Sequence, residues 1–145
     1  MVAYWDTSLL AGLYLLETRS AEVRELVRTI RTPIILTPLQ WHELRNTLRL
    51  AVYRRRITRA EASALLATLE NHVKAGTYEF LSPRWADVYS HAEQISAKHT
   101  ADSGNRALDI LHVASALAVG AREFYTFDLD QAVLARASGM RVRPA

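Results

Sequence analysis

The sequence predicts an α/β fold of three α/β/α layers, in which a mostly parallel central sheet is covered by helices on both faces. Short apolar runs rich in β-branched and aromatic residues alternate with longer segments of helical periodicity. Pro and Gly fall mostly where these segments end, and no repeat or flexible linker divides the 145 residues. We therefore expect a single domain over residues 1–145.

Composition excludes several classes of protein. Half of the residues are hydrophobic, which predicts a folded core, and the absence of Cys excludes disulfides, Cys-ligated zinc, Fe–S clusters and thiol nucleophiles. The longest uninterrupted apolar run, Leu9–Leu16, is far shorter than the roughly 20 residues of a membrane span, and no basic leader precedes it. We expect a cytoplasmic protein with no membrane segment. The net charge of +3 favours an anionic partner such as nucleic acid only weakly.

The first part of the chain predicts two strands and two helices. Val2–Trp5 is a short apolar run cut off by Asp6, and Pro33 separates an amphipathic segment from a β-branched one. The expected elements are a strand at Val2–Trp5, a short buried helix at Leu9–Leu16, a helix at Ala21–Arg31 and a buried strand at Ile34–Thr37.

The middle of the chain predicts an antiparallel pair of helices, Leu39–Arg56 and Arg59–Lys74. Thr58 and Glu61 have the spacing of a capping box at the start of the second helix. Gly76 ends that helix.

The last part of the chain continues the alternation of strands and helices. Its Ala-rich helix ends at Gly120, as expected of a tightly packed helix. The expected elements are strands at Tyr78–Leu81, Glu123–Phe127 and Met140–Arg143, and helices at Arg84–Lys98, Ala107–Val119 and Leu129–Ser138.

Four acidic residues map to one side of the predicted sheet. Asp6 and Asp128 follow strands, Asp109 lies near the start of the apolar helix, and Glu43 lies one turn into the helix after the second strand. Taken singly, each acid fits a helix cap or a surface position better than a metal site; Asp6, for example, would cap its helix. Together, oxygen ligands without Cys or a zinc-like His spacing favour Mg²⁺ or Mn²⁺, and phosphodiester hydrolysis is the matching reaction.

Four sequence blocks carry a resemblance to a known family. They are Tyr4–Leu10, His42–Leu44, Arg106–Ala116, and Thr126–Asp128 followed by Gln131 and Gly139. Each block alone is common, but the four in this order resemble PIN domains, most closely the VapC-type toxins of bacterial and archaeal toxin–antitoxin pairs. The resemblance covers the chain from end to end.

The resemblance implies a Mg²⁺- or Mn²⁺-dependent endoribonuclease that acts as the toxin of a type II toxin–antitoxin pair. Asp6 and Asp109 would be the primary metal ligands, with Glu43 and Asp128 completing the catalytic site directly or through water. Hydroxyl positions of the family would fall to Thr7 or Ser8 and to Thr126, and Asp130 would supplement Asp128; which of these residues assists stays open.

The resemblance also implies partners: an RNA substrate, an antitoxin protein whose C-terminal segment lies in a groove by the active site, and a second copy in a homodimer. Leu13 and Leu16 are candidates for that groove, although core packing is the better interpretation of Leu13.

Other polar and aromatic residues have a functional and a structural interpretation. Arg54 shares the helix face of Glu43 and would meet an RNA phosphate, or is simply solvated. His112 is expected to be a hydrogen-bonded neighbour of the acids rather than an acid or base. Trp5 and Trp41 are expected in the core rather than stacked on bases.

Two alternative functions fit the sequence less well. A non-catalytic PIN-like RNA- or protein-binding module would be expected to have lost one of the four acids, and none is replaced. A phosphoacceptor domain of the receiver type would need an acidic pair after the first strand and a Lys after a late strand, and the sequence has neither.

Overall fold

The computed structural model describes residues 2–144, which form two compact units. The first unit contains residues 2–6 and 81–144, and the second contains Thr7–Phe80. Each unit combines parallel strands with helices, so the α/β class predicted from the sequence is confirmed.

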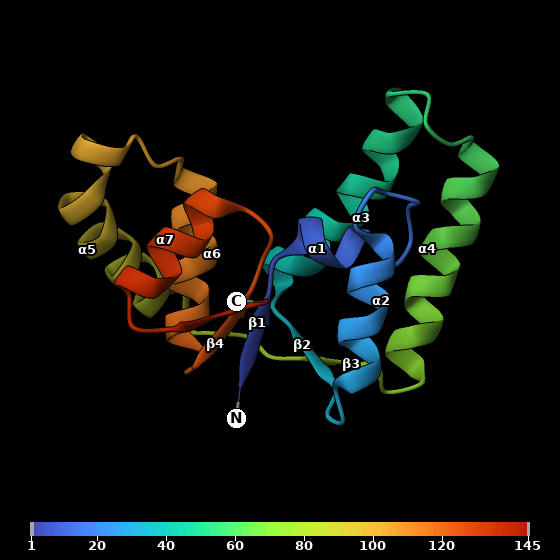
Figure 1. The fold of residues 1–145 in the computed structure, drawn as a ribbon. Helices are drawn as coiled ribbons and strands as arrows, with labels where there is room; N and C mark the ends of the chain where they lie inside the picture. The colour runs from blue at the N-terminus through green and yellow to red at the C-terminus, as the bar shows by residue number, and fades with distance from the viewer. Residues whose placement is uncertain (1, 145) are drawn as a thin grey trace. The chain divides into compact units, whose positions relative to one another are not determined.

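The first unit is built on strands β1 (Ala3–Trp5), β4 (Glu123–Tyr125) and β5 (Arg141–Arg143). β4 lies between the other two and pairs with both in parallel, with Phe124 opposite Tyr4 on one side and Val142 on the other. The helices of this unit are α5 (Trp85–Ser103), α6 (Ala107–Ala118) and α7 (Leu129–Ala137) (Figure 1).

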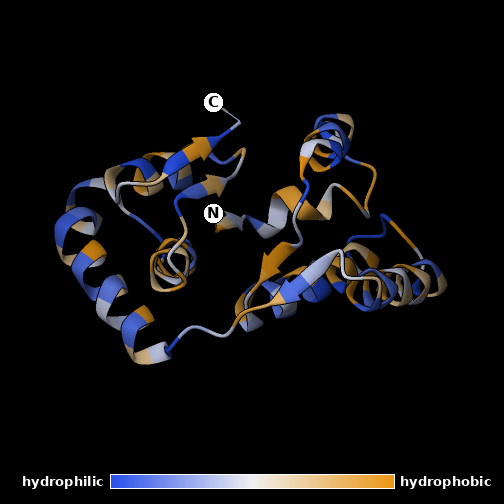
Figure 2. Ribbon diagram, turned by 90° about the horizontal axis from the view of Figure 1, so that it is seen from below, coloured by the Kyte–Doolittle hydropathy of each residue, from blue (hydrophilic) through white to orange (hydrophobic). Residues whose placement is uncertain are grey.

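The core of the first unit forms around the Ala-rich helix α6. Val113, Ala114 and Ala116 are fully buried, and their small side chains let neighbouring elements approach closely. Beneath them the rings of Tyr4 and Phe124 stack with centroids 5.3 Å apart. Along α5, hydrophobic residues alternate with longer hydrophilic stretches (Figure 2), as expected of a helix with one buried face.

The second unit pairs strands β2 (Ile34–Leu36) and β3 (Tyr78–Phe80) in parallel. Its helices are α1 (Thr7–Ala11), α2 (Ser20–Thr29), α3 (Pro38–Tyr53) and α4 (Arg59–Lys74). Figure 1 shows α3 and α4 as an antiparallel hairpin whose connecting turn lies at the end away from β2 and β3. Leucines at helical spacing fill its core, with Leu44, Leu48 and Leu69 fully buried.

Capping boxes define the start of both helices of this hairpin. The predicted box of Thr58 and Glu61 is confirmed, since each side chain bonds the backbone N–H of the other residue at 3.1 Å. Thr37 and Gln40 make a second box at the start of α3, where Pro38 takes a first-turn position that needs no N–H donor.

Three predicted helix ends differ from the structure by three residues or more. The helix expected to reach Leu16 ends at Ala11, and residues 12–14 form turns. α3 ends at Tyr53 because Arg55 adopts a left-handed φ of 58°. α5 continues past Lys98 to Ser103 and stops where Gly104 has a φ of 64°.

Within residues 2–144, no helix is long and apolar enough to cross a bilayer.

The second unit contains a buried pair of tyrosine hydroxyls. Tyr14 Oη lies 2.7 Å from Tyr78 Oη and 2.8 Å from His72 Nδ1. Burial is the main cause that raises the pKa of both tyrosines above the usual value of about 10, and the neighbouring Tyr78 raises the pKa of Tyr14 further. The folded chain therefore holds these phenol protons more tightly than the unfolded chain.

We predict that the free energy of unfolding falls as pH rises above about 10, because only the unfolded chain releases these protons readily. The stabilisation from the protonated Tyr14 and Tyr78 is fully present below the pKa that these tyrosines have in the unfolded chain. Urea unfolding from about pH 8 to about pH 11 would measure the slope. Tyr14→Phe should flatten the slope, whereas replacing the exposed Tyr53 by Phe should not. Equal slopes for wild type and Tyr14→Phe would contradict the prediction.

Candidate active site

Asp6 lies at the carboxyl end of β1, with its side chain only 4% exposed. Its backbone N–H donates to the Tyr125 carbonyl at 2.9 Å and so extends the pairing of β1 with β4 by one residue. Trp5 stacks on Tyr125 with ring centroids 4.1 Å apart, which fixes the strand ends beside Asp6. As predicted, Trp5 is a core residue.

Thr126 follows β4 and contacts Asp6 directly. The Thr126 hydroxyl donates to Asp6 Oδ2 at 3.0 Å, and both residues are buried. The same hydroxyl accepts the backbone N–H of Asp128 at 3.0 Å. Thr126 therefore orients a carboxylate, which is one of the roles left open by the sequence.

Asp128 is an exposed residue and caps the helix that follows. Its Oδ1 accepts the backbone N–H of Gln131 at 3.0 Å, at the start of α7. The helix-cap interpretation of Asp128 is thus correct for its Oδ1 atom. Asp130, its possible supplement, is also exposed.

Gln131 contacts both Asp109 and Thr126. Its side-chain amide donates to Asp109 Oδ1 at 3.1 Å, and its carbonyl oxygen lies 3.3 Å from the Thr126 hydroxyl. Gln131 is 3% exposed, so its amide depends on these contacts. Asp6, Thr126, Gln131 and Asp109 thus form one polar cluster, in which the single hydroxyl hydrogen of Thr126 serves either Asp6 or Gln131 at a time. Asp128 contacts Thr126 and Gln131.

Sequence reasoning included Gln131 in the family blocks but assigned it no role. The available signal was the spacing: a residue three positions after an N-cap Asp has its backbone bonded to that cap, and its side chain is directed by the first turn of the helix. A long polar side chain on the buried side of that turn needs polar partners, and the nearby acids supply them.

Glu43 belongs to the second unit and lies in the second turn of α3. The Thr7 hydroxyl donates a hydrogen bond to Glu43 Oε1, and the Thr47 hydroxyl donates to the Glu43 carbonyl at 2.9 Å. Glu43 is partly buried. The Thr7 hydroxyl therefore meets a predicted site acid in this unit.

His112 lies one turn after Asp109 on α6 and is 1% exposed. Its Nδ1 is 2.7 Å from the Tyr4 hydroxyl. A buried imidazole held by a buried tyrosine agrees with the predicted structural role better than with proton transfer to solvent.

The oxygen atoms of this group have the chemistry of a site for a hard divalent cation. Thr126 donates to the Asp6 carboxylate and Gln131 donates to the Asp109 carboxylate, as second-layer hydrogen bonds orient metal ligands. Over the residues that the structure describes, no three Asp, Glu, His or Cys side chains surround a common point. The oxygen donors match the ligand preference of Mg²⁺ or Mn²⁺ in chemistry, but among the described residues they do not converge as a formed metal site.

Comparison with known proteins identifies the family. The model of the PIN domain family matches residues 3–137. The chain belongs to the PIN domain family. No curated protein matches its sequence significantly.

Solved structures with a similar fold include the following three. VapC20 of Mycobacterium tuberculosis, described as a sarcin–ricin loop cleaving toxin, has a TM-score of 0.67 and 20% identity over 98% of this chain and 99% of that chain. FitAcB of Neisseria gonorrhoeae has a TM-score of 0.71 and 19% identity over 97% and 96% of the two chains. VapBC2 of Rickettsia felis, bound to a promoter DNA fragment, has a TM-score of 0.66 and 12% identity over 99% and 98%. At these identities the likeness concerns the fold.

We predict that Gln131→Met lowers the affinity for Mn²⁺ by about 10- to 100-fold, because Asp109 loses the donor that orients it. The cap of α7 should survive, since Gln131 contributes its backbone N–H to that bond. Calorimetric titration of Mn²⁺, with the melting temperature as a check on folding, would measure the effect. The exposed Gln94→Met is the matched control, and unchanged Mn²⁺ affinity in Gln131→Met would contradict the role of Gln131.

Proposed function

We propose that this PIN-domain protein is a Mg²⁺- or Mn²⁺-dependent endoribonuclease that acts in the cytoplasm as the toxin of a type II toxin–antitoxin pair. The observation that carries the proposal is the polar cluster in which Thr126 donates to Asp6 and Gln131 donates to Asp109, so that carboxylates of separate elements are both oriented. A purely structural acid needs no such arrangement between a strand end and a helix.

In this proposal Asp6 and Asp109 hold the ion, and Glu43 and Asp128 complete the site directly or through water. A bound divalent ion would activate a water and offset the charge that develops on the phosphate. Thr126 and Gln131 orient Asp6 and Asp109, and Thr7 orients Glu43. Asp128 has Oδ2 left for the site, because the helix cap uses Oδ1.

The alternative, a PIN-like module that binds RNA or protein without cutting, is less well supported. All four acids are present, and the buried Thr126 and Gln131 that contact Asp6, Asp109 and Asp128 are costly to keep in a pure binding scaffold.

We predict that Asp6→Asn and Asp109→Asn each reduce RNA cleavage in Mn²⁺ by at least about 100-fold, since each removes a proposed ligand charge. Gel analysis of an RNA mixture incubated with antitoxin-free protein would measure this, and a chelator should abolish cleavage by the wild type. Asp102→Asn, which changes an exposed acid at the end of α5, should cut normally. Cleavage that survives chelation, or that Asp6→Asn leaves intact, would exclude this mechanism.

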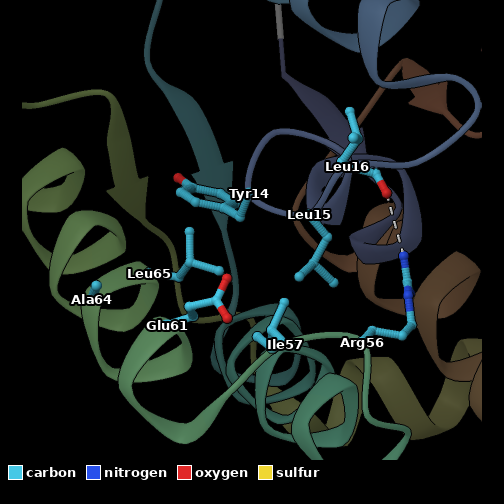
Figure 3. Close-up of a pocket in the computed structure, with 8 residues that line it drawn as sticks. All are labelled: Tyr14, Leu15, Leu16, Arg56, Ile57, Glu61, Ala64 and Leu65. Carbon is cyan, nitrogen blue, oxygen red and sulfur yellow. Dashed lines mark hydrogen bonds between the residues drawn. The ribbon is translucent and has the colours of Figure 1, made fainter.

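The proposed antitoxin would contact a cavity of about 450 Å³ beside Leu16. Figure 3 shows Tyr14 and Leu15 facing Glu61 and Leu65 of α4 across this space. Leu16 is 88% exposed at its rim, whereas Leu13, the other candidate, is partly buried. An apolar side chain this exposed beside a lined cavity is typical of a surface that a partner covers.

A second copy of the chain is proposed at α7. Leu129 and Val133 are 81% and 65% exposed and lie one turn apart, so they share one face of that helix. An apolar stripe on an otherwise amphipathic helix favours a homodimer contact at this face.

We predict that Leu16→Glu weakens antitoxin binding by at least about tenfold, because a buried leucine contributes about 1.5–3 kcal/mol. The binding partner to use is the product of a short reading frame for a small DNA-binding protein beside this gene, if one is present. Calorimetry would give the dissociation constant, with Ala97→Glu on exposed α5 as a control of equal charge. Equal affinity for wild type and Leu16→Glu would place the antitoxin elsewhere.

A further inference from the structure

The hairpin of α3 and α4 carries an uninterrupted run of positive charge. Six arginines and no acidic residue lie between Glu43 and Glu61. This segment covers most of α3, the connecting turn and the first residues of α4, at the end of the hairpin away from β2 and β3 (Figure 1). Without acids among them, these arginines create a local positive potential that the net charge of +3 conceals.

Two of the six arginines are engaged within the chain. Arg56 lies 3.6 Å from Glu17 and also donates to the Leu16 carbonyl, and Arg45 lies over the Trp41 ring at 5.3 Å. The other four are exposed, and among residues 2–144 their side chains make no hydrogen bond, ion pair or ring contact: Arg49, Arg54, Arg55 and Arg59. These four guanidinium groups are available to a ligand.

Two of these arginines line a cavity of about 590 Å³ together with an exposed aromatic ring. Tyr53, 84% exposed, stands with Arg49 and Arg59 at this cavity. The apolar part of the lining comes from Val52, Ala62 and Leu66. We call this cavity the α3–α4 cleft.

We propose that the α3–α4 cleft binds a nucleotide of single-stranded RNA, with the base against Tyr53 and the adjoining phosphates on Arg49 and Arg59. The planar guanidinium fork matches two phosphate oxygens, and an exposed aromatic ring offers a stacking surface to any base. Arg54 and Arg55 extend the phosphate contacts along the turn. An acidic peptide would pair with the arginines but would leave the tyrosine ring and the apolar lining unused.

The position of the cleft relative to Glu43 gives this site a role in substrate binding. α3 is continuous from Pro38 to Tyr53, so Tyr53 lies about 15 Å along the helix from Glu43. Thr47, Leu50 and Arg54 follow Glu43 along the same helix face at a spacing of three to four residues. The inference rests on the proposed function in taking RNA as the substrate, and the binding test below needs no cleavage.

The test is the affinity for a labelled single-stranded RNA of about 12 nucleotides, measured by fluorescence anisotropy with chelator present so that no RNA is cut. The double variant Arg49→Gln with Arg59→Gln should bind at least about tenfold more weakly, and the slope of log affinity against log salt should become shallower by about 1.4, or about 0.7 for each lost phosphate contact. Tyr53→Ala should bind about tenfold more weakly with an unchanged salt slope, and Tyr53→Phe should bind as the wild type does.

The matched control is Arg24→Gln with Arg31→Gln, which removes the same charge from exposed positions of the same unit. Circular dichroism would verify the fold of each variant. The proposal would be overturned if both double variants bound the RNA with equal affinity. It would also be overturned if the cleft double variant lost binding to polyglutamate but kept its binding to RNA. If wild type binds RNA through the cleft yet cuts none in Mn²⁺, the nuclease function fails and the cleft stands; if it cuts RNA and the cleft variants bind normally, the cleft alone fails.

Discussion

Burial of the Asp6 carboxylate is the constraint on which the first unit depends. An ionised carboxylate out of water is costly unless hydrogen-bond donors surround it, and Thr126 supplies one at 3.0 Å. Thr126 can do so only because β1 and β4 are parallel neighbours in register, with Trp5 opposite Tyr125. A shift of one residue in this pairing would turn these side chains to the other face of the sheet.

At the start of α7, the helix cap made by Asp128 and the hydrogen bond to Asp109 share one residue, Gln131. Asp128 caps the helix through the backbone of Gln131, which sets the direction of the Gln131 side chain toward Asp109. A residue whose simple interpretation is helix capping therefore also contributes to the orientation of the acids. For Asp128, capping the helix and contacting the groups that orient the other acids are therefore not separate roles.

Charge is divided more sharply in this protein than its total suggests. Asp6 and Asp109 belong to the polar cluster of the first unit, whereas the hairpin of the second unit carries six arginines without an intervening acid. Glu43 lies at the start of that arginine segment, on the same helix. A polyanion attracted by the hairpin would thus be held on the element that also carries one of the proposed catalytic acids.

The sequence by itself determined the α/β class, the capping box at Thr58 and the family, because each depends on short-range patterns of residues: alternation of apolar runs, a spacing of three, and four ordered blocks. It also indicated the four acids. Only the tertiary structure revealed the role of Gln131, because Thr126 and Asp109 reach it from different elements, 22 residues apart in the case of Asp109. Likewise, the end of α3 depends on the left-handed φ of Arg55, and the α3–α4 cleft on how two helices pack, which local periodicity does not specify.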